Sequence, residues 1–372
     1  MRILLTLPEL NSGGVESHVF CLARALKEEG HHVVVVSAGG QKADDLEKAG
    51  VIHYQLDVKR KSLFTVLQAV VSMKKIIKDE DIQLVHAHSR VPAWIGYYAA
   101  RKEGIPFLTT AHSHYSIHLG SKSMVKGERI IAVSQSVAEH LHHGFQIPYE
   151  KMILIRPAID IEAFERGSED RLKTREELGI KKDEIVIGNV ARLSSLKGHQ
   201  YLLQAAAIIR DKLVSDEEKN RYRLLIVGDG PERDGLERLA EDLNIMAMLI
   251  FTGERNDIPR LLAAMDIFVL SSTKEGLGLS AVEAMAARKP VILTDCCGIA
   301  KDISDGKEGL LVPAAEPDKL AFSIYQLSKQ HELMEDLAKR GNSFAKKYFS
   351  INRMVEDTVM IYHDLIKDKN GG

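Results

Sequence analysis

The sequence has few cysteines, and their positions do not suggest a structural role. There are three in 372 residues, at Cys21, Cys296 and Cys297. Adjacent cysteines do not form an ordinary bridge with each other, so the chain has no disulfide framework. This absence argues against a small secreted scaffold and predicts a protein of the reducing cytosol.

Long apolar runs and a strong excess of one charge are also missing. No stretch approaches the ~20 apolar residues that a membrane-spanning helix needs. The first residues, Met1–Leu7, hold one basic residue and a very short apolar run, which predicts a strand rather than a secretory signal. The net charge of −2 argues against a bulk nucleic-acid binder. We therefore expect a cytoplasmic protein, and a peripheral role at the inner face of the cytoplasmic membrane stays open.

The near-neutral total hides two different halves. Residues 1–160 hold 19 Lys and Arg against 16 Asp and Glu, together with 12 of the 15 histidines. The remaining residues hold 31 Lys and Arg against 36 Asp and Glu. A basic first half is suited to an acidic ligand or surface.

Short apolar runs rich in β-branched residues alternate with helical stretches in the first half. The predicted strands are Arg2–Leu7, Val33–Ser37, Leu84–His86, Phe107–Thr110 and Arg129–Val133, and the predicted helices are Glu16–Glu29, Leu63–Lys78, Pro92–Glu103 and Ser134–His143. Strands that alternate with helices of this length form βαβ units and a parallel sheet.

The pattern restarts after a polar segment at residues 156–182. The second set of predicted strands is Ile185–Asn189, Leu224–Val227, Leu249–Thr252, Ile267–Leu270 and Val291–Thr294. We expect an α/β protein with two doubly wound, Rossmann-like domains, at residues 1–158 and 170–348, joined by a linker at 159–169. The helical tail is expected to cross back, so that about residues 350–372 complete the first domain. Ligands of such sheets bind beyond the carboxyl ends of the strands.

Two glycine-rich turns join predicted strands to helices. Asn11-Ser12-Gly13-Gly14 opens the first helix, where glycine lets backbone N–H groups point at a phosphate. A turn that merely needs glycine explains this segment about as well. Gly228-Asp229-Gly230-Pro231 is a second such turn and is weak evidence alone. Neither matches G-x-G-x-x-G, and no acidic residue closes the strand Val33–Ser37, so a standard NAD site is disfavoured.

Two cations follow the first predicted strand of the second domain. Arg192 and Lys197 lie five residues apart on one loop and can converge on a diphosphate. A random pair of surface cations is more often solvated. Their place at the carboxyl end of a strand favours the functional interpretation.

Two carboxylates surround the start of a later helix. Glu275 lies on the loop, where Gly276 and Gly278 allow a tight turn, and Glu283 lies about one turn into the helix. The N–H groups of Leu279 and Ser280 suit a phosphate. The alternative is an amphipathic helix with a solvated Glu283.

The spacing of Glu275 and Glu283, together with Arg192 and Lys197, closely resembles the retaining family-4 glycosyltransferases of the GT-B fold. Gly13-Gly14 and the segment Arg156-Pro157-Ala158-Ile159-Asp160 also fit, and the resemblance covers nearly the whole chain. The family often has Pro-Asn-Gly-Val-Asp in this segment, so the hinge is less typical. The resemblance implies two Rossmann-like domains that face each other across a cleft, with no cofactor and no essential metal.

The resemblance also implies roles for these residues. Glu283 would bind the ribose of a nucleotide, Glu275 the hydroxyls of the transferred sugar, and Arg192 and Lys197 the diphosphate. Amides near Gly13, Gly14, Gly278, Leu279 and Ser280 would complete the phosphate cradle. His112, which follows a predicted strand, would contact the donor sugar. The catalytic set is therefore Glu275, Lys197, Arg192 and His112.

Two metal-binding interpretations are weak. His112, His114 and His118 could bind a metal by composition, but no nearby carboxylate or cysteine completes the site. Asp79-Glu80-Asp81 matches an Asp-x-Asp pattern, yet it precedes a strand and is expected at the amino end of the sheet, as a solvated loop.

The acceptor is less well defined than the donor. The stretch His88–Trp94 resembles, more loosely, bacterial transferases of the lipopolysaccharide core, and Arg90 would suit an anionic acceptor. A helix start with a buried Trp94 explains the stretch equally well. Basic residues that could contact anionic lipid are Lys59, Arg60, Lys61, Lys74, Lys75, Lys122 and Lys126, although surface lysines also serve solubility.

The sequence therefore predicts a retaining, metal-independent glycosyltransferase. Its donor would be a UDP-, GDP-, ADP- or other nucleoside-diphosphate sugar, and its acceptor a glycan or glycolipid of the bacterial envelope, such as lipopolysaccharide core or surface polysaccharide. The alternatives are a GT-B nucleotide-sugar epimerase or phosphorylase, and a non-catalytic nucleotide-sugar-binding protein. The presence of all four charged donor residues weighs against the last.

Overall fold

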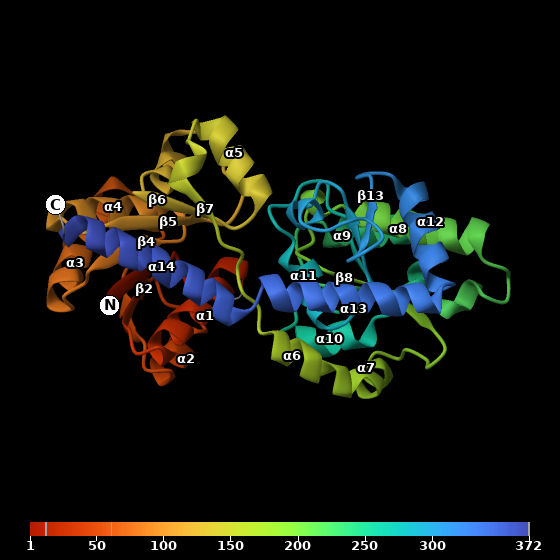
Figure 1. Cartoon of the computed structure of the whole chain (residues 1–372). Helices are drawn as coiled ribbons and strands as arrows, with labels where there is room; N and C mark the ends of the chain where they lie inside the picture. Colours follow the sequence, from red (N-terminus) through yellow and green to blue (C-terminus); the bar gives the residue numbers. More distant parts are fainter. Residues whose placement is uncertain (12, 61, 371–372) are drawn as a thin grey trace. The chain divides into compact units, whose positions relative to one another are not determined.

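The computed structural model of the chain describes residues 1–11, 13–60 and 62–370. It divides into two compact units, one of Met1–Ile159 with Phe349–Gly372 and the other of Asp160–Tyr348 (Figure 1). Each unit is built around one parallel sheet, as the strand and helix pattern predicted.

The first unit holds a seven-stranded parallel sheet in the order β3-β2-β1-β4-β5-β6-β7. The strands are β1 (Arg2–Thr6), β2 (His32–Ser37), β3 (Ile52–Gln55), β4 (Leu84–Ala87), β5 (Phe107–Ala111), β6 (Arg129–Ala132) and β7 (Met152–Leu154). The central strands are apolar because helices cover both faces of the sheet, so side chains that point either way are buried.

The helices of this unit follow the strands in turn. They are α1 (Gly14–Glu28), α2 (Ala43–Lys48), α3 (Leu63–Asp79), α4 (Arg90–Glu103), α5 (Gln135–Phe145) and α14 (Ile351–Asn370), with short turns η1 (Leu119–Val125) and η2 (Tyr149–Lys151). The last helix, α14, lies beside α1 and buries Met354 and Tyr362 in the same core as Leu22 (Figure 1). The C-terminal tail is therefore helical and returns to the first unit, as expected from the sequence.

The second unit holds a six-stranded parallel sheet in the order β10-β9-β8-β11-β12-β13. The strands are β8 (Ile185–Val190), β9 (Tyr222–Val227), β10 (Leu249–Phe251), β11 (Ile267–Leu270), β12 (Val291–Thr294) and β13 (Leu310–Val312). Its main helices are α6 (Ile161–Arg166), α7 (Arg171–Glu177), α8 (His199–Ile208), α9 (Arg233–Asp242), α10 (Ile258–Ala264), α11 (Leu279–Ala286), α12 (Pro317–Ser328) and α13 (His331–Tyr348). The short turns are η3 (Gly167–Asp170), η4 (Ser195–Lys197), η5 (Ile209–Leu213), η6 (Lys219–Arg221), η7 (Met246–Met248) and η8 (Gly298–Lys301).

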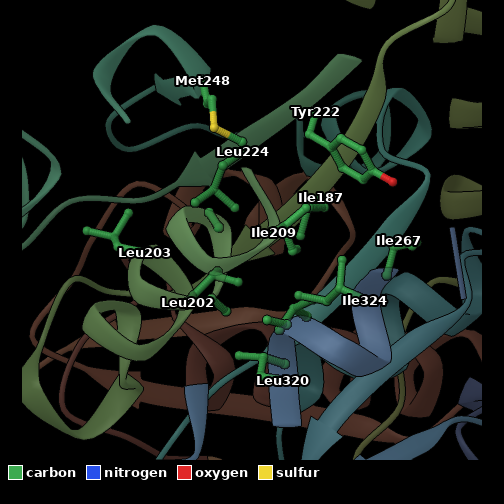
Figure 2. Close-up of a cluster of buried hydrophobic side chains, with 14 of the residues drawn as sticks. Ile187, Leu202, Leu203, Ile209, Tyr222, Leu224, Met248, Ile267, Leu320 and Ile324 are labelled. Carbon is green, nitrogen blue, oxygen red and sulfur yellow. The ribbon is translucent and has the colours of Figure 1, made fainter. Parts of the chain in front are cut away.

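One face of this sheet packs against α8 and α12 (Figure 2). Ile187 and Ile267 come from neighbouring strands, while Leu202 and Ile324 come from the two helices, and none is more than 1% exposed. Full burial of one such side chain contributes about 1.5–3 kcal/mol. The rigid sheet holds the loops at its carboxyl edge.

Three strands were not predicted, namely β3, β7 and β13. Each has only three or four residues, and each forms an edge of its sheet. Edge strands are half-exposed, so they lack the continuous apolar run that identified the central strands. The segment 159–169, expected as a linker, contains helix α6, and all of it except Ile159 groups with the second unit. The side chain of Asp160 caps this helix by accepting a hydrogen bond from the backbone N–H of Ala163 at 2.9 Å.

Candidate functional site

The sheet of the second unit has a topological switch point between β8 and β11. These two strands are neighbours, but the chain runs outward through β9 and β10 before it returns to form β11. The loops that follow β8 and β11 therefore leave the sheet side by side and in opposite directions. Crevices of this kind are where open α/β sheets bind ligands.

Lys197 and Glu275 meet at this switch point. Lys197 lies in η4 after β8, Glu275 lies on the loop after β11, and their side chains form an ion pair. The two side chains are 26% and 16% exposed, so the pair is partly shielded from water. The other oxygen of Glu275 accepts a hydrogen bond from the backbone N–H of Gly276 at 3.1 Å. Both residues are predicted site residues from the sequence, and in the structure they are in direct contact.

Backbone contacts fix these two loops to each other. The N–H of Thr273 donates to the carbonyl of Leu196 at 2.9 Å, and the Ser271 hydroxyl donates to the carbonyl of Lys197 at 3.2 Å. Gly198 has φ of 63°, and a Cβ there would lie 2.1 Å from the Ser271 carbonyl oxygen. Only glycine allows this close approach. The position of the Lys197 side chain is thus set by the backbone of two loops.

Helix α11 begins at the same edge of the sheet. Gly278 precedes it in the left-handed conformation, and no side chain caps this end. Backbone N–H groups at an uncapped helix start, here at Leu279 and Ser280, can bind an anion. Glu283 is the fifth residue of α11 and is half-buried, one turn from this end.

Gly298 brings a third loop against the Glu275 loop. A Cβ at Gly298 would lie 1.9 Å from the carbonyl oxygen of Gly276. The neighbouring N–H of Ile299 donates to the carbonyl of Leu277 at 2.8 Å. Neither Gly298 nor Ile299, which follow β12, was identified from the sequence, because their role rests on a contact with another loop.

Arg192 lies on the loop after β8 and is exposed. It forms no ion pair within residues 1–11, 13–60 and 62–370. Its loop is held by the second glycine-rich turn, because the N–H of Leu193 donates to the carbonyl of Asp229 at 3.0 Å. A Cβ at Gly230 would lie 2.3 Å from the Leu193 carbonyl oxygen. The turn at residues 228–231, which alone was weak evidence for a phosphate site, therefore contacts and positions the loop that carries Arg192.

A buried histidine lies beside Lys197. His199 hydrogen-bonds through Nε2 to Oδ1 of Asn189 at 3.0 Å, and the amide of Asn189 donates to the carbonyl of Val269 at 2.8 Å. Burial, with a smaller contribution from the charge of Lys197, lowers the pKa of His199 to about 4. His199 is therefore neutral at pH 7, and it supports Asn189, the residue of β8 that bonds to β11. Neither His199 nor Asn189 was identified from the sequence.

The first unit has its own switch point, between β1 and β4. Gly13 precedes α1, whose first residue is Gly14, and the carbonyl of Gly13 accepts the N–H of Ser17 at 3.0 Å. Gly13, at the cap position, has no side chain to offer, and no cap hydrogen bond is present among the residues that the structure describes. Ser12, part of the predicted phosphate loop, lies outside the described residues.

Histidines gather at the same edge of the first sheet. His86 lies in β4, His88 and His112 follow β4 and β5, and His18 lies on α1. The His88 and His112 rings hydrogen-bond through Nδ1 and Nε2 at 3.2 Å, and the His18 ring lies 4.9 Å from that of His112. Burial lowers the pKa of His18 to about 4 and the pKa values of the other three well below the usual range.

The sequence suggested His112, His114 and His118 as a possible metal-binding set, but these three histidines do not form one group in the structure. His114 hydrogen-bonds to the Ser136 hydroxyl at 2.9 Å, and His118 to the Ser121 hydroxyl at 3.3 Å. His112 instead joins His18 and His88, and one nitrogen of each lies within 4.8 Å of the others. Residues 94 positions apart in the sequence make this group, so local spacing could not show it.

Arg90 is the first residue of α4 and is half-buried. The carbonyl of Arg90 accepts a hydrogen bond from the hydroxyl of Ser123 at 2.8 Å. Burial raises the pKa of Tyr115 to about 12, and the charge of Arg90 opposes this rise. The hydroxyl oxygen of Tyr115 accepts a hydrogen bond from the backbone N–H of His112. Trp94 is half-buried and donates to the carbonyl of Gly120 at 3.3 Å. The structure thus places Arg90 at the start of α4, close to the segment that follows β5.

The Asp-x-Asp segment is not simply a solvated loop. Glu80 is 15% exposed, accepts the Tyr54 hydroxyl at 2.6 Å and contacts His32 at 2.8 Å. It lies before β4, at the amino end of the strands, as expected. Glu80, at the end of α3, therefore links this helix to His32 of β2 and Tyr54 of β3. The run of acidic residues in the sequence did not indicate these contacts.

Two parallel-sheet units of this topology, with charged loops at the carboxyl edges, form the architecture of the GT-B glycosyltransferases. Two family models match the chain in order: "Glycosyltransferase Family 4" at residues 12–163 and "Glycosyl transferases group 1" at residues 170–344. The chain belongs to the glycosyltransferases that combine these two domains.

Similar proteins agree with this assignment. N-acetyl-alpha-D-glucosaminyl L-malate synthase of Bacillus anthracis is 26% identical, with 94% of each chain covered. UDP-Gal:alpha-D-GlcNAc-diphosphoundecaprenol alpha-1,3-galactosyltransferase of Escherichia coli is 25% identical, covering 83% of this chain and 82% of that one.

Solved structures share the fold. A glycosyltransferase from Rickettsia africae ESF-5 superposes with a TM-score of 0.86 at 26% identity, covering 98% and 99% of the two chains. HepE of Anabaena, in complex with UDP-glucose, gives 0.84 at 21% identity over 98% and 100%. WaaG, described as involved in lipopolysaccharide biosynthesis, gives 0.73 at 18% identity over the full length of both chains.

Proposed function

We propose that this glycosyltransferase transfers a sugar from a nucleoside-diphosphate sugar to an acceptor hydroxyl with retention of the anomeric configuration. The observation that carries the proposal is the Lys197–Glu275 pair at the switch point of the second unit. It places a cation and a carboxylate beside an uncapped helix start, which are the groups that a diphosphate and a sugar hydroxyl require.

The diphosphate is assigned to one side of this site. Arg192 and Lys197 neutralise it, and the N–H groups of Leu279 and Ser280 add the favourable field of a helix start. Arg192 is exposed and not committed to an ion pair within the described ranges, so it is available to a phosphate. These groups stabilise the charge that grows on the leaving diphosphate, so the chemistry does not depend on a divalent cation.

The two carboxylates are assigned to sugars. Glu283, one turn into α11, hydrogen-bonds the ribose, and Glu275 hydrogen-bonds hydroxyls of the transferred sugar. When the diphosphate arrives, Lys197 exchanges part of its contact with Glu275 for a phosphate oxygen. His112 of the first unit is assigned to the transferred sugar as well, and amides near Gly13 and Gly14 to the phosphate.

Retention follows a same-face route in this proposal. The bond from the anomeric carbon to the diphosphate oxygen breaks, and a bond from that carbon to the acceptor oxygen forms on the same face. The acceptor proton moves to an oxygen of the departing diphosphate. Glu275 is engaged by Lys197 and by the N–H of Gly276, which supports a binding role rather than that of a covalent nucleophile.

The acceptor is proposed to be a glycan or glycolipid of the bacterial envelope. The name of the E. coli relative specifies a sugar carried on diphosphoundecaprenol, and WaaG acts in lipopolysaccharide synthesis. Arg90 is a suitable partner for an anionic acceptor of this kind.

A face of α3 is proposed to contact the membrane that carries this acceptor. Phe64, Leu67 and Val71 are 69%, 58% and 68% exposed, and their spacing puts them on one side of the helix with Lys75. They border an open hollow of about 550 Å³. Lys59 pairs with Glu9, Lys74 with Glu103 and the exposed Arg60 with Asp57, whereas Lys75 is exposed and forms no ion pair among the described residues. Lys61 lies outside the described residues.

No helix of the described chain is long and apolar enough to cross a membrane. The proposed location, which rests on this face of α3 and on the proposed acceptor, is the cytoplasm at the inner face of the cytoplasmic membrane.

A donor screen tests the proposal. The purified protein is incubated with UDP-, GDP-, ADP- and CDP-sugars, beginning with UDP-sugars because HepE and the E. coli relative name them. Release of one nucleoside diphosphate supports the transferase. An epimerised donor, or sugar phosphate formed only with added phosphate, would instead indicate the alternative enzymes. Tight binding of a donor without turnover, even with lipid extract as acceptor, would indicate a binding protein.

A further inference from the structure

Three histidines of the first unit form a compact triangle at the carboxyl edge of its sheet. The ring centroids of His18, His88 and His112 are separated by 4.9 to 5.4 Å. His18 and His88 are 4% and 1% exposed. The three come from α1 and from the loops after two adjacent strands, so the fold itself gathers them.

The nitrogen positions suit a tetrahedral metal ion. Zn²⁺ binds imidazole nitrogen at about 2.0–2.1 Å, which places two ligand nitrogens about 3.3 Å apart. Nδ1 of His88 and Nε2 of His112 are 3.2 Å apart. A nitrogen of His18 lies within 4.8 Å of the nitrogens that the other two offer, so a shift of that nitrogen by at most about 1.5 Å would bring it to the spacing of a tetrahedral ligand. In the metal-free protein the short pair is a hydrogen bond.

Two nitrogens of the group lack a partner. Nδ1 of His18 and Nε2 of His88 are buried and have no hydrogen bond within the part of the chain that the structure describes. Buried polar atoms are nearly always satisfied, and the exceptions call for an explanation. An ion bound by Nδ1 of His18 would satisfy the first of these atoms, whereas Nε2 of His88 lies on the ring edge away from the Nδ1 that pairs with His112 and is not explained by the ion.

His86 shows why the group has three members and not four. Its ring packs 4.1 Å from that of His88. Both of its nitrogens are occupied, however, by the hydroxyls of Tyr362 and Thr110, each at 2.7 Å. These bonds hold His86 as a rigid support behind His88, whereas the other three rings face one another.

We propose that His18, His88 and His112 bind one divalent transition-metal ion of the zinc class, with water in the fourth position. Neutral imidazoles without a carboxylate select Zn²⁺, Cu²⁺ or Ni²⁺ over Mg²⁺ and Ca²⁺. Metal binding inhibits sugar transfer, because it occupies the His112 ring that the proposed function assigns to the donor sugar. This second step rests on the proposed function, while metal binding itself does not.

Cobalt absorption tests the site without reference to activity. Co²⁺ is titrated into the metal-free full-length protein, and the visible bands of tetrahedral cobalt are followed. We expect saturation at one equivalent, displacement by Zn²⁺, and no displacement by Mg²⁺ at a hundredfold excess. His18→Gln and His88→Gln should each weaken binding by at least tenfold.

The chain provides a matched control pair. His114 and His140 lie in the same unit with ring centroids 5.0 Å apart, but each hydrogen-bonds elsewhere. The double variant His114→Gln/His140→Gln should bind Co²⁺ like the wild type. Equal binding by the wild type and by folded His18→Gln and His88→Gln would overturn the proposal, and so would the absence of tetrahedral bands.

Zinc-edge X-ray absorption of the wild type keeps the test valid if the buried variants fail to fold. Three imidazole ligands at about 2.0 Å are expected, and a shell with fewer imidazoles overturns the site. Inhibition is measured separately: Zn²⁺ should block donor turnover at the concentration that displaces Co²⁺. An active enzyme that binds Zn²⁺ without loss of rate overturns the inhibition, whereas a protein that binds Zn²⁺ and turns over no donor contradicts only the proposed function.

Discussion

Lys197 and Glu275 are separated by 78 residues in the sequence and form an ion pair in the structure. They belong to loops that follow two neighbouring strands of the second unit, and those loops are hydrogen-bonded to each other. The pair is therefore held in place before any ligand arrives. Preorganised charge of this kind is the usual main source of rate in enzymes.

Loss of either partner should remove most of the activity. We expect Lys197→Ala and Glu275→Ala each to lower the turnover number by about 100–1,000-fold, because a charge aimed at the reacting groups is lost. The measurement is nucleotide release with a saturating donor. Lys274→Ala is the matched control, since Lys274 is exposed and adjoins Glu275. Near-normal turnover in either folded site variant would reject its assignment.

Gly198 should be intolerant of a side chain. We expect Gly198→Ala to lose more stability than Gly179→Ala, because both glycines have φ near 65° but only Gly198 faces a backbone oxygen at 2.1 Å. The shared left-handed strain costs about 1–2 kcal/mol, and the overpacking at Gly198 adds about 1–3 kcal/mol. Urea unfolding measures both. Equal losses would mean that the two loops separate easily, contrary to the account of Lys197.

The buried neutral His199 should make stability depend on pH. Its pKa is about 4 in the folded protein, below the ordinary 6.5, so the unfolded chain binds its proton first as pH falls. The contribution of His199 is thus complete above pH 6.5 and is lost between pH 6.5 and 4, by an amount on the order of 3 kcal/mol. His199→Gln should show a smaller fall in the free energy of unfolding over this range.

The control for this prediction is His331→Gln, which changes a histidine with a side chain 84% exposed in the same unit. Its pH dependence should match that of the wild type. If His199→Gln also matches the wild type, His199 is protonated in the folded state and its assignment as a neutral support fails.

The exposed face of α3 should determine membrane binding. We expect Leu67→Ser/Val71→Ser to reduce sedimentation with phosphatidylglycerol vesicles by about tenfold, since each side chain loses apolar area that the bilayer would cover. Leu172→Ser removes a leucine of similar exposure, 67%, from the second unit and should have no effect. Binding that the paired substitution leaves unchanged, or no binding at low salt, would argue against this face.

The central strands, the main helices and the charged loops could be predicted from the sequence. Buried parallel strands such as β1 and β11 read as continuous apolar runs, and the residues that follow them necessarily meet at one edge of the sheet. This logic identified Lys197, Glu275 and Glu283 without knowledge of their contacts. The family resemblance supplied the roles that local pattern alone left open.

Other features depend on contacts that no local pattern encodes. His18, His88 and His112 come from three separate segments, and only the tertiary fold shows that they meet. Gly230 and Gly298 look like ordinary turn residues, yet each is required by a backbone oxygen of a different loop. Likewise, no local pattern shows that His199 is buried, because its contact with Asn189 forms only when α8 packs beside β8.

Proton NMR of donor turnover tests the central claim most directly. The donor selected by the screen is incubated with the wild type and with Glu275→Ala, and the anomeric signal of the first-formed sugar product is recorded. The account predicts a product with the same anomeric configuration as the donor, formed by the wild type and nearly absent with Glu275→Ala. An inverted product, or equal rates for the two proteins, would contradict it.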